Sequence, residues 1–469
     1  MAAGGLERGF AALVVLVAAA LTGAMAVPVP AAAGPTVGGA GPATDFDAGV
    51  PASYEFDPVT ESGVATVAGE EYDSVQRAVN AAEPGQTVVL RGQFDEPVEV
   101  NTTGVTITSP PDRLAAIDGG GEGDVLTVNA PNVTVRGVWV RNSGYDASTN
   151  DAGVWVDAPN VSLVDSRVTD VTFGVWVDGV NDATLRNNTI VGRESVEPRS
   201  ARGNGIQLWK TADSRVVDNR ITDARDGIYY SWASNVTARG NVLWDLRYGV
   251  HYMYSDNNLL ENNTAFDNDV GYALMLSENI RVMNNTAANN TGTSGHGILL
   301  KRIDDSEIRG NALVGNGRGI YMLNAVRNPI SDNLLLGNRI GIHLTAGTAD
   351  ERVTGNSFID NGRNVLAVTA NQHVWNETDR GNYWDDAGAA DLDDDGVSEL
   401  RHRPAGLVEA LVQEQPTAAV FTRSPAFRAI REAEQSLPVI NAPGVVDYHP
   451  LTTPPHENWR EYYERDRDD

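Results

Sequence analysis

A five-residue phrase, a glycine followed by alternating residues, recurs through the middle of the chain at a nearly constant interval. The copies GIQLW, GIYYS, GVHYM, GYALM, GILLK, GIYML and GIHLT begin at Gly205, Gly227, Gly249, Gly271, Gly297, Gly319 and Gly341. Successive glycines lie 22, 22, 22, 26, 22 and 22 residues apart, and such a period indicates a solenoid. Asn- and Gly-rich stretches between the copies suit the left-handed backbone of tight corners. A leucine-rich horseshoe would need a Leu-x-x-Leu-x-Leu scaffold, which is missing. The sequence therefore predicts an all-β, right-handed parallel β-helix with rungs of about 22 residues.

Strand alternation assigns the two faces of each rung, because successive side chains of a strand point to opposite sides. The positions one and three after each glycine are apolar or aromatic in every copy, so we expect them to fill the interior. The positions two and four after it must then face outward. They are Gln207/Trp209, Tyr229/Ser231, His251/Met253, Ala273/Met275, Leu299/Lys301, Tyr321/Leu323 and His343/Thr345. Aromatic, His and Met side chains on an outer face indicate a surface that contacts another molecule.

The ends of the chain differ from the repeat. Residues 1–33 are predicted to be a signal peptide, with Arg8 before an apolar run and Ala24-Met25-Ala26 as a cleavage site, so the protein is expected to work outside the cytoplasm. An uncleaved N-terminal anchor is the alternative. Residues 34–70 are interpreted as a linker, 71–370 as the β-helix, and 371–469 as a C-terminal segment with an acidic loop, a short helix and a tail.

The sequence predicts two departures from the regular β-helix, one at its start and one within it. Asp73–Ala82 is expected to form a short helix with Asp73 as its N-cap, covering the open end of the solenoid. A 31-residue step between Gly174 and Gly205 places an inserted loop at about 193–202.

Composition narrows the function classes. The formal net charge is −28 with a sequence pI of about 4.5, which suits a high-salt environment and argues against nucleic-acid binding. The chain has no cysteine, so disulfides and thiolate metal sites are excluded.

A soft-metal site is predicted on the outward face. Met253 and Met275 occupy the same column on adjacent rungs, about 4.8 Å apart at the backbone, and His251 shares their face. Thioether and imidazole ligands without thiolate or carboxylate favour Cu(I). Met283 follows on the next strand and is a further candidate ligand. The alternative is that these methionines only pack under a loop or against a partner.

A second metal site is predicted in the C-terminal segment. Asp391, Asp393, Asp395 and Gly396 match the D-x-D-x-D-G opening of a calcium loop. Position 12 of that loop is His402 instead of a bidentate Glu, and a solvated acidic turn remains the alternative.

A hydrolase is an alternative to these binding functions. Ser294-Gly295-His296-Gly297, followed by Lys301, is similar to the Gly-His-Gly element of β-helical polygalacturonases. That chemistry also needs grouped carboxylates, and the neighbouring outward positions offer Met275, Leu299, Tyr321 and Leu323 instead. We therefore expect His296 to lie in the corner of a lengthened rung, and no catalytic residue is assigned.

Several segments resemble the NosD family across essentially the whole chain after the signal peptide. They are GVHYMYSDNN (249–258), VGYALMLSENIRVMNN (270–285), GILLKRIDDSEIRGN (297–311) and the closing pieces RGNYWDD, LDDDG, RSPAF and VVDYHPL. The acidic loop departs from the family's usual wording at Glu399 and at Arg401-His402.

The resemblance implies an extracytoplasmic, non-enzymatic accessory protein for the maturation of nitrous oxide reductase. It implies partners, namely that reductase, the ATPase and membrane subunits of an ABC transporter, and a copper chaperone. Delivery of copper, as transient Cu(I), or of sulfur to the reductase's copper-sulfide centre would be the role. Docking residues are proposed on the outward column: Trp155, Trp176, Trp209, Tyr229 and Tyr321. The alternatives are a carbohydrate-active β-helical enzyme, such as a hydrolase, lyase or epimerase, and a structural scaffold that binds no metal.

Overall fold

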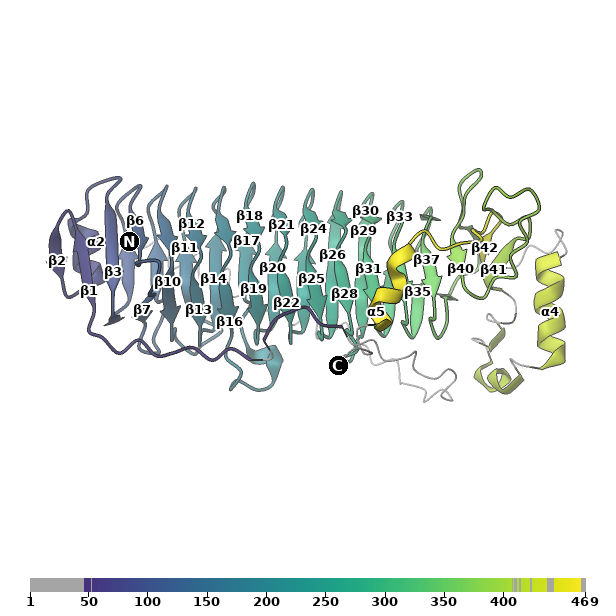
Figure 1. Ribbon diagram of the computed structural model, residues 1–469, viewed down its shortest axis with the longest axis horizontal. Helices are drawn as coiled ribbons and strands as arrows, with labels where there is room; N and C mark the ends of the chain where they lie inside the picture. Colours follow the sequence, from purple (N-terminus) through teal and green to yellow (C-terminus); the bar gives the residue numbers. More distant parts are fainter. Residues whose placement is uncertain are drawn as a thin grey trace. The chain divides into compact units, whose positions relative to one another are not determined.

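The chain folds as an all-β, right-handed parallel β-solenoid of about 13 turns with rungs of about 23 residues, which confirms the predicted fold (Figure 1). The computed structural model describes residues 46–51, 53–406, 408, 411–412, 415–421, 424–436 and 443–464. The predicted signal peptide and the start of the predicted linker lie outside these residues. The described residues belong to two compact units, Pro51–Val236 and Thr237–Asp469 with Pro35–Val50, called the N-terminal and C-terminal units.

Each turn of the N-terminal unit contributes one short strand to each of three sheets. Sheet I has the order β2 (Glu70–Tyr72), β1 (Val64–Val67), β3 (Thr87–Arg91), β6 (Thr106–Thr108), β9 (Thr134–Arg136), β12 (Ser162–Val164), β15 (Thr184–Arg186), β18 (Arg215–Val217). Sheet II runs β4 (Gln93–Asp95), β7 (Ala115–Asp118), β10 (Val138–Arg141), β13 (Arg167–Thr169), β16 (Thr189–Val191), β19 (Arg220–Thr222). Sheet III runs β5 (Val98–Val100), β8 (Leu126–Val128), β11 (Ala152–Val156), β14 (Phe173–Asp178), β17 (Ile206–Trp209), β20 (Asp226–Ser231).

The C-terminal unit repeats this plan. Its sheet I strands are β21 (Thr237–Arg239), β24 (Leu259–Glu261), β27 (Arg281–Met283), β30 (Glu307–Arg309), β33 (Pro329–Ser331) and β36 (Arg352–Thr354). Sheet II has β22 (Val242–Trp244), β25 (Thr264–Phe266), β28 (Thr286–Ala288), β31 (Ala312–Val314), β34 (Leu334–Leu336), β37 (Ser357–Ile359) and β40 (Tyr383–Trp384). Sheet III has β23 (Tyr248–Met253), β26 (Val270–Glu278), β29 (His296–Asp304), β32 (Arg318–Leu323), β35 (Ile340–Leu344) and β38 (Val365–Ala367).

A short helix, α2 (Val75–Ala81), packs against the first strands, as the sequence predicts. Its N-cap is Ser74 and not Asp73, because the Ser74 side chain accepts the Arg77 backbone N–H at 3.1 Å. Asp73 instead forms an ion pair with Arg77 on the exposed side of the helix. The expected loop at 193–202 is also present and contains only a short 3₁₀ turn, η1 (Arg199–Ala201).

The predicted interior columns fill the core. The residues one and three after each repeat glycine are all fully buried: Ile206, Leu208, Ile228, Tyr230, Val250, Tyr252, Tyr272, Leu274, Ile298, Leu300, Ile320, Met322, Ile342 and Leu344. The glycine itself is required by close approach of successive rungs. A Cβ on Gly297 would lie 2.8 Å from the backbone oxygen of Gly319 and 3.0 Å from Nδ2 of Asn316, which is closer than a side chain tolerates.

Buried asparagines form hydrogen-bonded ladders along the C-terminal unit. One ladder joins Asn241, Asn263, Asn285, Asn311, Asn333, Asn356 and Asn382. In the middle of it, Oδ1 of Asn311 accepts the backbone N–H of Asn285 at 2.8 Å, and Nδ2 of Asn311 donates to the backbone oxygen of Val282 at 2.9 Å. The asparagine amides therefore supply hydrogen-bond partners to backbone groups at the corners, where the chain passes from one sheet to the next.

Carboxylates terminate the ladders where the repeat ends. Asp447, which is fully buried, accepts the backbone N–H of Asn382 at 2.7 Å. In a neighbouring ladder Glu351 accepts the backbone N–H and the amide of Asn328 at 2.9 and 3.1 Å. Burial raises the pKa of Glu351 to about 8, so this carboxyl holds a proton near neutral pH.

The C-terminal segment covers this end with its own small sheet, β39 (Gln372–Val374), β42 (Gly444–Asp447) and β41 (His402–Ala405). The predicted short helix is present as α4 (Pro425–Ser436). The remaining described helices are the 3₁₀ turns η2 (Pro416–Phe421) and η3 (Glu457–Arg460) and the single turn α5 (Glu461–Glu464).

Candidate functional site

The predicted copper ligands His251, Met253 and Met275 lie on two adjacent strands of sheet III. Strands β23 and β26 are parallel, with His251 opposite Ala273 and Met253 opposite Met275. His251, Met253 and Met275 are 3%, 7% and 6% exposed. Val250, Tyr252 and Leu274 alternate with them and fill the core, so the three candidate ligands share the other face of the sheet. The structure therefore brings these two sulfur atoms and one imidazole into a single buried patch, called the Met/His patch below.

Met283 does not belong to the Met/His patch. It lies on β27 in sheet I, where its partners in register are Glu261 and Arg309. The sequence prediction failed here because the strand at each repeat glycine lies in sheet III, whereas the next strand, which carries Met283, lies in sheet I. Met283 is half-buried beside a carboxylate and a guanidinium, which is not a soft-metal environment.

The Met/His patch suits a soft monovalent cation better than a hard one. Its ligand atoms are two thioether sulfurs and an imidazole nitrogen, and His251 has its ring edge-on to Tyr248 with the centroids 5.0 Å apart. Lys301 follows Met275 in register on the next strand, so a positive charge borders the patch on that side. Thioethers and imidazole are neutral ligands of the kind that bind Cu(I).

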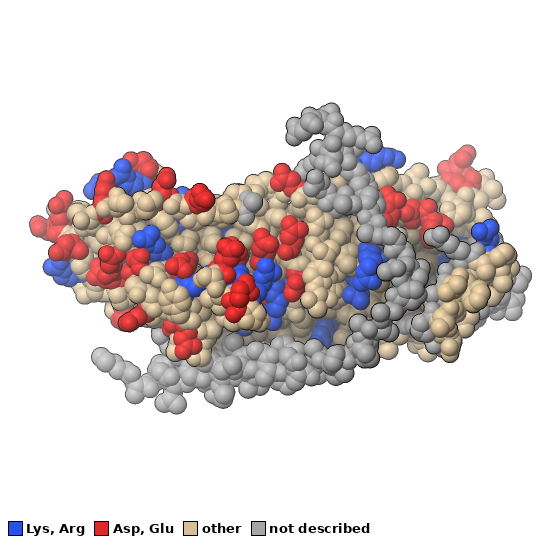
Figure 2. All heavy atoms as spheres, turned by 90° about the horizontal axis from the view of Figure 1, so that it is seen from below, with Lys and Arg blue, Asp and Glu red and all other residues tan. Residues whose placement is uncertain are grey.

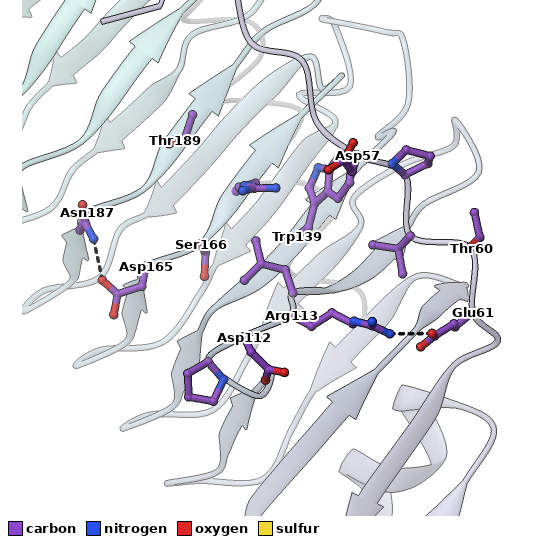
Figure 3. Close-up of a pocket in the computed structure, with 15 residues that line it drawn as sticks. Asp57, Thr60, Glu61, Asp112, Arg113, Trp139, Asp165, Ser166, Asn187 and Thr189 are labelled. Atoms are coloured by element: carbon purple, nitrogen blue, oxygen red, sulfur yellow. Dashed lines mark hydrogen bonds and ion pairs between the residues drawn. The ribbon is translucent and has the colours of Figure 1, made fainter. Parts of the chain in front are cut away.

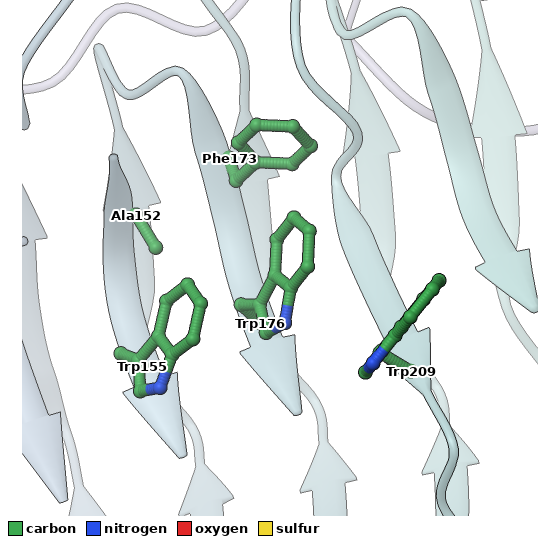
Figure 4. Packing of buried hydrophobic residues seen from close by; sticks show 5 residues of the cluster. All are labelled: Ala152, Trp155, Phe173, Trp176 and Trp209. Carbon is green, nitrogen blue, oxygen red and sulfur yellow. The ribbon is translucent and has the colours of Figure 1, made fainter. Parts of the chain in front are cut away.

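The predicted docking aromatics are mostly buried, so the expectation of an open aromatic surface is wrong. Trp155, Trp176, Trp209 and Tyr229 are buried, and Tyr321 is half-buried. Trp155 and Trp176 stack in register on β11 and β14 with centroids 5.1 Å apart, and Phe173 meets Trp176 edge-on at 4.9 Å. Figure 4 shows Trp155, Trp176 and Trp209 projecting from three successive strands. Alternation identified their face correctly but could not show how closely these rings pack.

The three predicted calcium ligands gather in one loop. One carboxylate oxygen from each of Asp391, Asp393 and Asp395 lies within 4.8 Å of the others. Asp391 also accepts the backbone N–H groups of Asp395 and Gly396 at 3.1 and 2.9 Å, which shapes the loop. His402, at position 12 of the sequence pattern, does not close this loop, because it is buried and its Nε2 lies 3.3 Å from Asp386.

His296 is not in a corner, as the sequence suggested, but is the first residue of strand β29. Its ring stacks on Tyr321 with centroids 4.7 Å apart, and Tyr321 also contacts His343 at 4.9 Å. Arg318 lies opposite His296 in register and donates from Nε to Nδ1 of His343 at 3.1 Å. This group was missed because the position just before each glycine was not included among the outward columns. Extending the repeat by one residue would have placed His296 and Arg318 together.

A cavity of about 730 Å³ in the N-terminal unit is lined by the segment Asp57–Glu61 (Figure 3). Two of its carboxylates are engaged, Glu61 by Arg113 at 2.6 Å and Asp165 by the amide of Asn187 at 2.8 Å. Its aromatic residue, Trp139, is buried against Phe56 and donates from Nε1 to Thr169.

On the face seen in Figure 2, Asp and Glu side chains are spread along the surface, with Lys or Arg side chains among them. Within the described residues, no helix is long and apolar enough to span a membrane.

The sequence matches a known protein family. A family model described as "Periplasmic copper-binding protein (NosD)" matches residues 187–389, a range that contains the whole Met/His patch. The chain is 36% identical over 357 residues to a probable ABC transporter binding protein NosD of Pseudomonas aeruginosa, covering 73% of this chain and 82% of that protein. It is 34% identical over 360 residues to the protein of the same description from Stutzerimonas stutzeri, with the same two coverages of 73% and 82%.

Among solved structures, the A-module of a mannuronan C-5 epimerase from Azotobacter vinelandii superposes with a TM-score of 0.51 at 16% identity. That match covers 63% of this chain and 91% of the module, and at such low identity it supports the β-solenoid fold alone. The sequence matches are of a different kind, because they reach 36% and 34% identity over 73% of this chain. The chain belongs to the NosD family of periplasmic copper-binding proteins.

Proposed function

We propose that this protein is a non-catalytic accessory protein, working outside the cytoplasm, that receives Cu(I) on the Met/His patch and passes it on during maturation of nitrous oxide reductase. The observation that carries the proposal is the register of Met253 with Met275 beside His251 on one buried face. A copper chaperone would be the donor and the reductase's copper-sulfide centre the destination. A sulfur species is the alternative cargo for the same route.

The chemistry of the Met/His patch supports transfer more than permanent storage. Neutral thioether and imidazole ligands bind Cu(I) without a thiolate, so a chaperone or acceptor site with stronger ligands can take the ion over. The side chains of His251, Met253 and Met275 are only 3–7% exposed. The residues packed around them must therefore move before an incoming protein can exchange copper with them. The C-terminal segment around α4 is proposed as the region that holds the transporter's membrane subunit.

An ABC transporter is the proposed membrane partner, since both relatives are named as probable ABC transporter binding proteins. Co-purification of the transporter's membrane subunit with the tagged full chain, from the native host, tests this association. Recovery of the chain without that subunit, under conditions that keep the transporter intact, would count against it.

Loss of copper binding is the expected result of replacing Met253 and Met275 together with leucine. Leucine keeps the apolar volume but removes both sulfur ligands, so the affinity for Cu(I) should fall by at least about 100-fold. The measurement is an anaerobic titration of the full chain against a competing Cu(I) chelator, followed by maturation of the reductase in cells that carry the variant.

The matched control is Met322→Leu, which changes a fully buried core methionine flanked in register by Leu300 and Leu344. It should leave copper affinity unchanged. Unaltered affinity and maturation in the double variant would remove copper from the proposal. Absence of Cu(I) binding in every form would leave a scaffold or a sulfur carrier.

A structural calcium ion is proposed in the Asp391–Asp395 loop. At low salt, calorimetric titration with Ca²⁺ should show one binding event, which Asp393→Asn should weaken by about tenfold or more because it removes one of three clustered carboxylates. Asp394→Asn, at an exposed position of the same loop with φ 60°, is the control and should bind normally. A chain that gives no heat of binding at low salt has a solvated acidic turn there instead.

A further inference from the structure

A second cluster on sheet III of the C-terminal unit has chemistry opposite to that of the Met/His patch. It consists of His296, Arg318, Tyr321 and His343 on the adjacent strands β29, β32 and β35. Tyr321 lies between the two imidazoles, and Arg318 spans the cluster, donating to His343 Nδ1 at 3.1 Å and to the backbone oxygen of Ser294 at 3.1 Å. None of these groups takes part in the proposed copper chemistry.

The hydrogen bond from Arg318 fixes the tautomer of His343. Because Arg318 Nε donates to Nδ1, the neutral ring must carry its proton on Nε2. Burial and the charge of Arg318 lower the pKa of His343 to about 4, so the ring is neutral at pH 7. Its Nε2–H is a buried donor without an acceptor among the described residues. A buried donor left in this way is unfavourable unless a ligand supplies the acceptor.

His296 contributes a second unsatisfied atom. The residue is only 6% exposed, and its Nδ1 has no hydrogen-bond partner among the described residues. Burial, followed by the charges of Arg318 and neighbouring groups, lowers the pKa of His296 to about 3. Two neutral imidazoles on the strands beside Arg318 thus each have a buried nitrogen without a hydrogen-bond partner among the described residues. In a purely structural cluster, buried polar groups are usually all hydrogen-bonded.

The charge around the cluster is positive in a strongly acidic protein. Arg318, Arg339 and Arg363 all act on His343, yet none of the three forms an ion pair with a carboxylate within the part of the chain that the structure describes. Arginines elsewhere in this unit do find partners, as Arg309 does with Asp332 and Arg327 with Asp305. A local excess of guanidinium groups beside buried N–H donors is an arrangement that recognises negative charge.

We propose that Arg318, His343 and His296 form a binding site for a small inorganic oxyanion of the size and charge of sulfate or phosphate. The guanidinium would supply charge-assisted hydrogen bonds, and the Nε2–H of His343 would supply a neutral donor. A metal ion fits less well, because His343 offers no free lone pair while Arg318 occupies Nδ1. Three nearby guanidinium charges also repel a cation.

The test is calorimetric titration of the full chain with sulfate and, separately, with phosphate, in sodium chloride solutions of constant ionic strength. Saturable binding of either anion is expected, and the better ligand identifies which charge and protonation state the site prefers. Arg318→Gln should weaken binding by about 10-fold to 100-fold, because a charged donor is replaced by a neutral one. His343→Gln keeps an N–H donor near that position, so it should weaken anion binding less than Arg318→Gln does.

Arg327→Gln is the matched control, since it removes an arginine that forms an exposed ion pair with Asp305. It should bind the anion like the unaltered protein. The idea is overturned if neither anion binds saturably to the unaltered chain, or if Arg327→Gln weakens binding as much as Arg318→Gln. Cu(I) affinity should be the same in the Arg318→Gln variant, so the fate of the copper proposal is read separately.

Discussion

Replacing Asn311 with alanine is expected to lower the free energy of unfolding by about 3 to 5 kcal/mol. The Asn311 side chain is buried and joins three rungs at once. Its loss would take the acceptor from the backbone N–H and from the side-chain amide of Asn285, and would remove the hydrogen bond donated to the backbone oxygen of Val282. Each buried unsatisfied group costs about 1–3 kcal/mol, and the vacated volume adds to this. Urea or thermal unfolding followed by circular dichroism measures the change.

Two further variants make this prediction specific to the ladder. Asn311→Ser should lose less stability than alanine, because Ser166, at the matching corner of an earlier rung, accepts the backbone N–H of Val138 on the rung before it. Asn262→Gly is the control. Asn262 is exposed with φ 53°, which glycine adopts freely, so its replacement should change stability by less than about 1 kcal/mol. Equal losses for Asn311→Ala and Asn262→Gly would mean that the amide ladder does not stabilise the solenoid.

The repeat made the fold predictable because each rung repeats the same physical constraints. The period of the glycines, the apolar columns beside them and the corner asparagines all agree on one architecture, and every predicted core position is buried. The ladders could not be read in the same way. In the pair Asn284-Asn285 the first residue has φ 53° and the second is buried, and the residue type alone does not distinguish these two roles.

The candidate sites were predictable only as far as strand register extends. Met253 and Met275 occupy equivalent repeat positions, so their pairing followed from counting. Met283 lies on a strand whose sheet the pattern did not determine, and it proved to face different neighbours. The His296 and His343 cluster depends on the direction that Arg318 takes across three rungs, which is a property of side-chain packing and not of sequence spacing.

The same fold therefore carries two chemically distinct groups on one sheet of the C-terminal unit. His251 and two methionines gather soft, uncharged ligands, whereas Arg318 and its histidines gather donors and positive charge. A solenoid permits this because each rung contributes its outward residues independently of the interior columns that hold the rung in place. Copper and an anion would then be bound on adjacent rungs of sheet III without competing for the same side chains.

Asp447→Ala is expected to release the C-terminal segment from the solenoid and to cost about 3 to 5 kcal/mol. Oδ2 of Asp447 accepts the backbone N–H of Asn382 at 2.7 Å and the indole N–H of Trp384 at 2.9 Å. Oδ1 accepts the backbone N–H of His449 at 3.0 Å. Alanine would leave three donors without an acceptor, two of them on the buried residues Asn382 and Trp384, where β42 meets the last ladder residue.

Limited proteolysis of the folded protein measures this release, since a detached segment is cleaved while the solenoid resists. The Asp447→Ala chain should lose its C-terminal segment several times faster than the unaltered protein, whereas Asp379→Ala, at an exposed position nearby, should be cleaved at the normal rate. Asp447→Asn should lie between the two, because the amide oxygen can still accept from Asn382 but the amide nitrogen opposes another N–H donor. If the proposed transporter contact uses the C-terminal segment, Asp447→Ala should also reduce co-purification of the membrane subunit while leaving Cu(I) affinity unchanged. Normal cleavage of Asp447→Ala would show that β39 and β41 hold β42 in place without this carboxylate.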